Sequence, residues 1–503
     1  GSRSVAVGTA ALQAQNFTTA TDTHNTAVGF SAGKAVTTGT ANTLVGGLAG
    51  DALTTSQFNV AVGKSALSAD TLGSRSVAIG TFNLEVQNFT TATDVYNTAV
   101  GHGAGAVVTT GIRNTLIGGK AGVALTDADK NVAIGYAALS ADTLGSRSVA
   151  IGNAALEVQN FTTATDTYNV AIGDNAGAKV TTGTQNTLIG GLAGDAQTTS
   201  SGNTALGYAS LTDNVLGSNS VAIGRNALNA QNPATATDMY NVAVGNNCGE
   251  AITTGTANTF VGGLAGDATD DGTNNTAMGY LALSANCGND NTAIGKAAGS
   301  LITGGGNVCI GMEAGDALTS GNQNIIIGSG TDAATVSTNN AIVLGVGITA
   351  SANDFSFGKA SNVVTNDFDT DANWSRSSDE RLKKNITDQT LGLDFINDLR
   401  TVKYNWKASN ELDSSDSQLA HLYKENPADN EMNTDATMHN FIAQEVKAAL
   451  DTAGVSNFAG WKEDEKGVQQ VSREMFVIPL VKAVQELSTA LDAALARIAT
   501  LEG

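Results

Sequence analysis

The sequence predicts a mostly β protein, in which a parallel β-solenoid of about twenty coils precedes a small α+β domain that ends in a coiled-coil helix. Three observations support this fold class. A pentapeptide of the type SVAVG recurs twenty times between residues 4 and 345. The composition changes near residue 373, after which lie all three tryptophans and only five of the 58 glycines. A heptad pattern of apolar residues occupies the end of the chain.

The pentapeptide indicates one short strand in each repeat. Its β-branched residues favour extended backbone, and its closing glycine favours a turn. Spacings of 21, 17, 17 and 17 residues recur as a 72-residue block from residue 4 to residue 241. Such a short period is typical of a solenoid with one coil per repeat. With about 4.8 Å between neighbouring coils, the rod would be about 90 Å long.

Both faces of this strand are apolar. Positions two and four of the pentapeptide (Thr26 and Val28 in the second copy) share one face, and position three (Ala27) points to the other. One face can pack inside its own coil, but a strand that is apolar on both faces needs a second apolar surface. Identical chains supply one most simply. We therefore expect a homotrimer, with the small side chain at position three near the symmetry axis.

The first position of the pentapeptide is Asn or Ser, and it has two interpretations. The side chains could stack into a ladder that satisfies backbone groups at the turns. They could instead line a glycan-binding groove. The ladder is favoured because the residue recurs in nearly every coil, whereas a binding site needs a local difference.

Four longer coils supply such a difference. QNFTTATDTHN at 15–25 returns in related form at 87, 159 and 231. An exposed aromatic residue beside Asp, Thr and Asn suits contact with a carbohydrate or another surface. The alternative is a structural turn whose aromatic ring covers the rod. The candidate contact residues are Asp22, His24, Asp94, Tyr96, Asp166, Tyr168, Asp238 and Tyr240.

Charge and residue usage exclude several classes of function. A net charge of -21 argues against a nucleic-acid partner and an anionic membrane surface. There is no run of 18 apolar residues and no signal peptide, so membrane insertion is not expected.

The three cysteines (Cys248, Cys287 and Cys309) form no disulfide framework. No metal-ligand spacing and no calcium-binding GGxGxD nonapeptide occurs, so neither a metal nor a cofactor is expected. The acidic residues of the rod repeat as equivalents, without the unique carboxylate pair of a polysaccharide-degrading enzyme.

The chain is divided into a shaft at 1–358, a linker at 359–377 and a C-terminal domain at 378–503. In that domain, Ser378 or Asp379 can cap a helix. The pattern predicts a strand at 401–407 and an amphipathic helix at 440–454 that Gly454 ends. The heptad residues imply a coiled coil and again an oligomer. They are Leu480, Val484, Leu487, Leu491, Ala494, Ile498 and Leu501.

Two resemblances extend this interpretation. The SVAIG-like coils resemble the heads of trimeric autotransporter adhesins and the shafts of phage tail fibres. SDERLKKNI at 378–386, FINDLRTVKYNWK at 395–407, FIAQEV at 441–446 and IPLVKAVQEL at 478–487 occur in that order. Together they resemble the intramolecular-chaperone, auto-processing domain of phage tail fibres and tailspikes, over about residues 375–503. Asn440 departs from the Gly that many relatives have before FIAQEV, which concerns local backbone geometry.

The second resemblance implies a chaperone that trimerises the chain, templates the β-rod and then cuts itself off. Ser378 matches the nucleophile, Lys383 matches the general base, and the expected cut is at Ser378–Asp379 or immediately beside it. A serine hydroxyl is a weak nucleophile until a neutral base takes its proton. The expected product is a virion tail fibre, assembled in the host cytoplasm and joined to other tail proteins on its N-terminal side. Its partner would be a host cell-surface glycan or protein.

The repetitive rod gives a physical reason for a chaperone that is independent of that resemblance. Three identical repetitive chains have many near-equivalent registers, and their contacts are non-local. A trimeric clamp would fix the register before the rod forms, and cutting the clamp away would trap the assembly kinetically. The alternative is a bacterial trimeric surface adhesin whose C-terminal domain is only a trimerisation clamp.

Overall fold

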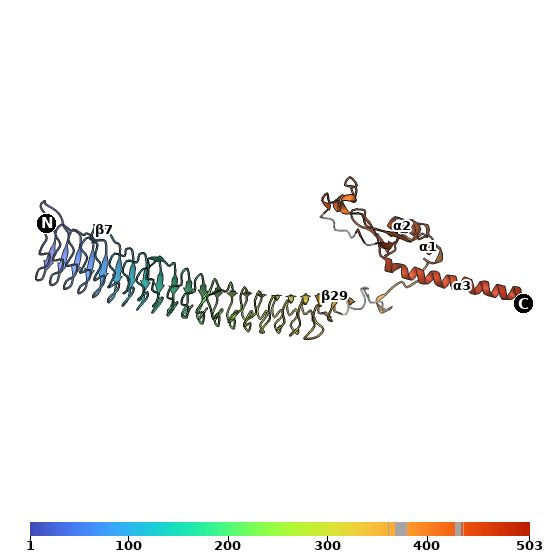
Figure 1. Cartoon of the computed structure of the whole chain (residues 1–503), viewed down its shortest axis with the longest axis horizontal. Coiled ribbons are helices and arrows are strands. Elements are labelled where there is room, and N and C mark those ends of the chain that lie inside the picture. The colour runs from blue at the N-terminus through green and yellow to red at the C-terminus, as the bar shows by residue number, and fades with distance from the viewer. Residues whose placement is uncertain (361, 368–379, 428–433, 436, 503) are drawn as a thin grey trace. The chain divides into compact units, whose positions relative to one another are not determined.

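The computed structural model describes residues 1–360, 362–367, 380–427, 434–435 and 437–502. The chain divides into two compact units, Gly1–Ser377 and Ser378–Gly503. The first unit is a stack of coils that each contribute one strand to a long sheet (Figure 1). The second is a small α+β unit with a long C-terminal helix. The predicted fold class, a mostly β solenoid followed by an α+β domain, is confirmed.

Within the described residues, 22 strands form the sheet of the shaft, and all but the last run parallel. The parallel strands are β1 (Val5–Val7), β2 (Thr26–Val28), β3 (Thr43–Val45), β4 (Val60–Val62), β6 (Val77–Ile79), β8 (Thr98–Val100), β9 (Thr115–Ile117), β10 (Val132–Ile134), β12 (Val149–Ile151), β14 (Val170–Ile172), β15 (Thr187–Ile189), β16 (Thr204–Leu206), β18 (Val221–Ile223), β20 (Val242–Val244), β21 (Thr259–Val261), β22 (Thr276–Met278), β23 (Thr292–Ile294), β24 (Val308–Ile310), β25 (Ile325–Ile327), β27 (Ile342–Val346) and β29 (Asp354–Lys359).

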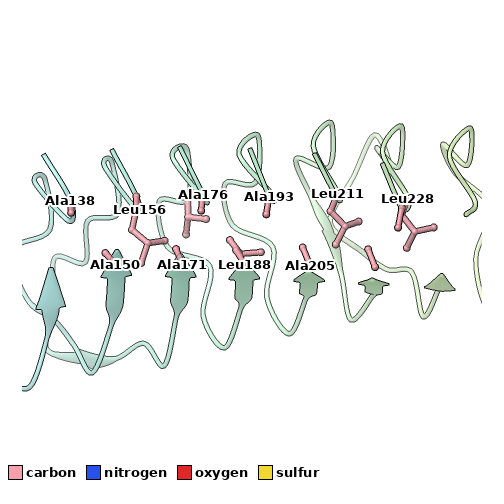
Figure 2. Packing of buried hydrophobic residues seen from close by; sticks show 14 of the residues in the cluster. Ala138, Ala150, Leu156, Ala171, Ala176, Leu188, Ala193, Ala205, Leu211 and Leu228 are labelled. Atoms are coloured by element: carbon pink, nitrogen blue, oxygen red, sulfur yellow. The ribbon is translucent and has the colours of Figure 1, made fainter. Parts of the chain in front are cut away.

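Each strand pairs in register with the equivalent residues of the next coil, as Ala27 with Leu44. Position three lies inside the coil and is fully buried in every copy from Ala27 onward. Figure 2 shows Ala150, Ala171, Leu188 and Ala205 pointing from their strands toward the turns across the coil. The expectation that position three lies near a symmetry axis is therefore wrong. A three-residue strand in so narrow a coil turns its middle side chain inward, so positions two and four face outward.

The closing glycine lets the coils stack closely. Gly29 has a φ of +140°, and a Cβ on it would lie 2.5 Å from the carbonyl oxygen of Gly46 in the next coil. Any other residue would therefore clash with the neighbouring backbone, besides adopting an unfavourable φ. The same approach recurs between successive pentapeptide glycines along the rod.

The first pentapeptide position forms the predicted ladder. The side-chain oxygen of Asn97 accepts a hydrogen bond from the backbone N–H of Asn114 at 2.8 Å, and Asn114 does the same for Asn131 at 2.9 Å. The side-chain amide of Asn114 donates to the carbonyl of Ala128 at 2.8 Å. These asparagines are fully buried. The ladder interpretation is confirmed, and these buried side chains line no glycan groove.

The second and third 72-residue blocks each begin with Ser instead of Asn at the first pentapeptide position. In each block, a glutamine of the long coil bridges this Ser to the next Asn of the ladder. Gln87 donates to the hydroxyl of Ser76 at 3.1 Å and accepts from the side-chain amide of Asn97 at 2.8 Å. Gln159 makes the same pair of bonds to Ser148 and Asn169. The polar column thus continues through the long coils. Short side strands pair beside it: β5 (Gly73–Ser74) with β7 (Thr93–Asp94), β11 (Gly145–Ser146) with β13 (Thr165–Asp166), and β17 (Gly217–Ser218) with β19 (Thr237–Asp238).

The end of the shaft extends beyond the repeats visible in the sequence. β29 adds a twenty-first coil strand that lacks the pentapeptide, next to β26 (Asp332–Ala333) paired with β28 (Thr349–Ala350). β30 (Asn362–Asp367) then pairs antiparallel with β29. Part of the segment expected as a linker therefore forms a strand. Its β-branched residues suit the sheet, and it covers an edge that would otherwise expose unpaired backbone groups.

The second unit contains short elements before one long helix. They are η1 (Glu380–Leu382), α1 (Leu393–Asn397), β31 (Val402–Tyr404), η2 (Ser409–Glu411), η3 (Ala420–Leu422), β32 (Met438–Asn440), α2 (Ala443–Thr452), β33 (Trp461–Glu463), β34 (Gln469–Val471), η5 (Arg473–Phe476) and α3 (Val477–Glu502). The predicted strand at 401–407 and helix at 440–454 correspond to β31 and α2, and Gly454 adopts a φ of +67° just after the helix.

Replacing Asn114 by Ala tests the ladder. The change leaves the buried backbone N–H of Asn131 and the carbonyl of Ala128 without partners, so we expect a loss of about 1–3 kcal/mol in unfolding free energy. Thr110→Ala, which removes only an exposed side-chain hydrogen bond to Asp127, should change it far less. Thermal unfolding followed by circular dichroism at one scan rate measures both. Equal midpoints for the two variants would contradict the ladder's role.

Candidate functional site

The predicted nucleophile Ser378 and the adjoining Asp379 lie outside the described residues. The structure begins again at η1, a single 3-10 turn in place of the expected helix start. The backbone N–H of Lys383 donates to the carbonyl of Glu380 at 2.9 Å, and the Lys383 side chain is exposed. The predicted Ser378–Lys383 pair therefore stays a prediction.

Two motifs that are far apart in the sequence converge, with Phe476 of η5, on one aromatic cluster. Phe395 in α1 stacks on Phe476 with ring centroids 6.2 Å apart, and Phe441 lies 4.9 Å from the same ring. Leu391, Val446 and Leu450 complete the buried centre. The FINDLR and FIAQEV segments are thus joined directly to the start of α3. Burial of such aromatic rings is a large stabilising contribution in a unit of this size.

Charged contacts tie the same motifs together at the surface. Arg400 and Glu445 form a two-pronged ion pair, with Nε donating to Oε2 at 3.1 Å. Hydrogen bonding from Arg400 lowers the pKa of the Glu445 carboxyl. The backbone N–H of Leu393 donates to Glu486 of α3 at 2.8 Å. Within the second unit, the segments before α3 therefore pack and bond to one another and to α3.

A basic pocket beside this scaffold was missed by sequence reasoning. Lys403 of β31, His439 of β32 and Arg473 of η5 line it, together with Asn440. Arg473 donates to the carbonyl of His439 at 3.4 Å. These residues come from three separate segments, so no local sequence motif predicts that they lie together. Asn440, singled out in the sequence for its departure from related domains, is part of its wall.

Helix α3 presents the predicted heptad residues to the exterior. Leu480, Val484, Leu487, Leu491, Ile498 and Leu501 are between 49% and 79% exposed, whereas Pro479 and Ala483 are buried. A continuous apolar stripe on a surface helix is typical of a coiled-coil seam. The helix therefore carries an unpartnered seam in the single chain.

The long coils hold their candidate residues in a repeated ion pair. Arg3 contacts Asp22 at 3.1 Å, Arg75 contacts Asp94 at 2.9 Å and Arg147 contacts Asp166 at 2.8 Å. Asn219 stands in place of Arg beside the fourth long coil and donates to Asp238 at 2.8 Å. Arg75 and Arg147 also lie over the rings of Tyr96 and Tyr168, at 5.7 and 5.8 Å. His24 and Tyr240 are exposed at the equivalent positions. Their role in surface contact remains a prediction.

The described residues hold no group of three His, Cys, Asp or Glu side chains able to bind a metal ion. They include no helix with both the length and the apolarity required to cross a bilayer. Cys248, Cys287 and Cys309 are buried thiols, and burial raises the pKa of Cys248 and of Cys309 to about 12. The interpretation of Cys309 as a small buried hydrophobe is confirmed.

Two buried carboxyls lie inside the shaft. Asp70 accepts hydrogen bonds from the N–H of Gly73 at 2.9 Å and from Gln87 at 2.7 Å, and Asp142 repeats the arrangement. Burial raises the pKa of both side chains. The equivalent residue in the third block is Asn214, which makes the same turn contact to Gly217.

Comparison with known proteins identifies the start of the second unit. Residues 378–455 match a peptidase family described as the chaperone of endosialidase. No curated protein and no solved structure matches the chain. The match begins at Ser378, the predicted nucleophile, and ends just beyond α2. A β-solenoid shaft followed by this domain fits a tail fibre or tailspike that carries an intramolecular chaperone, as the sequence resemblance implied.

Asp70→Asn tests the buried carboxyl. The pKa of Asp70 is higher in the folded state than in the unfolded state, so an ionised Asp70 lowers the unfolding free energy. This loss disappears as the pH falls through the folded-state pKa toward the unfolded-state pKa. The Asn variant keeps one acceptor oxygen and loses the hydrogen bond from Gln87 at every pH. Its unfolding midpoint relative to the wild type should therefore fall as the pH drops from 7 toward 4, because only the wild type escapes the cost of ionisation. Asp94→Asn, which removes an exposed ion pair, should show no such change. A constant difference between the wild type and the Asp70→Asn variant across this range would contradict this.

Proposed function

We propose that this chain is a phage tail-fibre or tailspike-like adhesin for host-surface attachment, built as a homotrimer with a self-cleaving C-terminal chaperone. The observation that carries the proposal is the match of residues 378–455 to the chaperone family, directly behind a repetitive shaft. The released product would be the shaft, incorporated into the virion through its N-terminal side. The long-coil residues from Asp22 to Tyr240 are candidates for host contact.

Two exposed apolar surfaces support assembly from identical chains. Position four of the pentapeptide leaves Ile79, Leu206 and Met278 exposed by 40–47% on the outward side of their strands, and position two leaves Ile325 exposed by 38%. The α3 seam is a second such surface. Copies of the same chain could cover each of these apolar surfaces, taken by itself. The shaft contact would thus use positions two and four, while position three fills each coil.

The cleavage chemistry rests on Ser378 and Lys383. Lys383 would take the proton from the Ser378 hydroxyl, and the Ser378 oxygen would form an ester with the carbonyl carbon of the peptide bond to be cut. Lys383 would return the proton to the departing amine as that C–N bond breaks. Water would complete the hydrolysis. Lys383 is exposed in the single chain, and a lysine acts as a base when desolvation favours its neutral form. Coverage by a neighbouring chain in the trimer would supply that desolvation, so cleavage would follow assembly.

Mass spectrometry of the purified chain tests self-cleavage. The wild type should yield fragments 1–378 and 379–503, or a cut immediately beside that bond. Ser378→Ala and Lys383→Ala should each leave the full-length chain, because each removes one partner in proton transfer. Ser377→Ala and Lys384→Ala are the matched neighbours and should still be cut. A wild-type chain that stays intact after folding would favour the bacterial adhesin with a clamp domain.

Leu487→Asp tests the trimer in a Ser378→Ala background, which keeps the two units joined. A carboxylate in an apolar seam must be desolvated without a partner, so assembly should be lost or greatly weakened. Thr489→Asp introduces the same charge elsewhere on α3 and should leave the assembly unchanged. Light scattering coupled to gel filtration should give three chain masses for the parent and the control. A trimeric Leu487→Asp protein would show that the seam does not hold the assembly.

A further inference from the structure

The turn after each shaft strand builds a second column of side chains along the rod. Backbone hydrogen bonds stack its positions one coil upon the next, as from Ala137 to the carbonyl of Gly119 and from Ala154 to that of Tyr136. Between residues 119 and 296 the column contains Tyr136, Tyr208 and Tyr280, at intervals of 72 residues. Four coils separate successive rings, which places them about 19 Å apart.

These three rings are available for contact. Tyr136, Tyr208 and Tyr280 are 58%, 55% and 51% exposed, and among the described residues no side chain hydrogen-bonds to their hydroxyls or stacks on their rings. The tyrosines of the long coils differ, because Arg75 and Arg147 already occupy Tyr96 and Tyr168. Exposed amphipathic rings without an internal partner are typical of binding surfaces.

A glycine precedes each ring in the column. Gly119, Gly191 and Gly263 do not adopt a positive φ, so the backbone does not require glycine there. A Cβ at each would meet the following tyrosine ring at 3.5–3.6 Å. Because glycine has no side chain, the backbone beside each tyrosine ring is uncovered. A larger residue at the same position would cover that backbone.

A hydrogen-bonded polar pair follows each ring. Asn153 donates to Asp174 at 3.0 Å after Tyr136, and Arg225 donates to Asn246 at 3.2 Å after Tyr208. Lys296 contacts Glu313 at 3.4 Å after Tyr280. Together these three pairs carry no net charge, although the whole chain is strongly acidic.

We propose that this column, named here the tyrosine row, binds a linear uncharged polysaccharide laid along the rod. A sugar ring offers an apolar C–H face that suits the exposed tyrosine and hydroxyls that suit the polar pair. The regular spacing favours a polymer over a small molecule, because one strand can engage several rings at once. The acidity of the protein disfavours a polyanion. This inference rests on the proposed host-attachment function and identifies its ligand class.

Affinity electrophoresis of the full chain tests the tyrosine row, with dextran, mannan or galactan in the gel and alginate as an acidic comparator. At least one neutral polymer should retard the wild type, and alginate should not. The triple variant Tyr136→Ala, Tyr208→Ala, Tyr280→Ala should bind at least about tenfold more weakly, because several contacts are lost together. Gly191→Leu should also weaken binding by covering the backbone beside Tyr208.

The control changes Val107, Val158 and Leu301 to Ala, which shortens three exposed apolar side chains of the shaft that lie outside the tyrosine row and outside the long-coil candidate contacts. It should bind as the wild type does. Retention of binding by the first triple variant, or a wild type that none of the neutral polymers retards, would overturn the inference. So would a changed assembly mass of the first variant in light scattering, because the row would then be a subunit contact. The fragment masses test the self-cleaving chaperone separately from either result.

Discussion

The hydrogen bond from the backbone N–H of one ladder residue to the side-chain oxygen of the preceding asparagine is the contact on which the shaft depends. It holds each coil in register with the next and removes an unsatisfied polar group from a narrow interior. Close approach at glycines such as Gly29 is possible only because that register is kept. The small residues at position three then suffice to fill the coil, as Ala150 and Ala171 do (Figure 2).

In an assembly of identical chains, the same regularity would leave the register between chains open. Because each block presents nearly the same contacts, identical chains could pair one block out of step with little local penalty. The ladder fixes the register of successive coils within one chain. It does not specify which coils of neighbouring chains would lie side by side. The aromatic cluster around Phe476 and the ion pair of Arg400 with Glu445 instead define a unique structure next to α3. A domain of that kind can align chains by its own fold.

Much of this architecture could be predicted from the sequence because local rules govern it. The pentapeptide, its spacing and the buried Asn column follow from strand, turn and capping chemistry that each coil repeats. The direction of position three could not be predicted, since it depends on how narrowly the coil closes. β29 was missed because its strand, Asp354–Lys359, lacks the motif. The tyrosine row and the pocket at Lys403, His439 and Arg473 were missed because only the three-dimensional path brings their members together.

The 72-residue block has a consequence for how such rods evolve. A block begins and ends on equivalent coils, so its first and last surfaces fit each other as well as they fit their present neighbours. Recombination that duplicates or deletes one block would change the reach of the fibre in steps of four coils while leaving every interior contact satisfied. The length of the rod could thereby vary while the strand pairing between coils is kept. Substitutions at single sites would act on a different property, the chemistry displayed along the side.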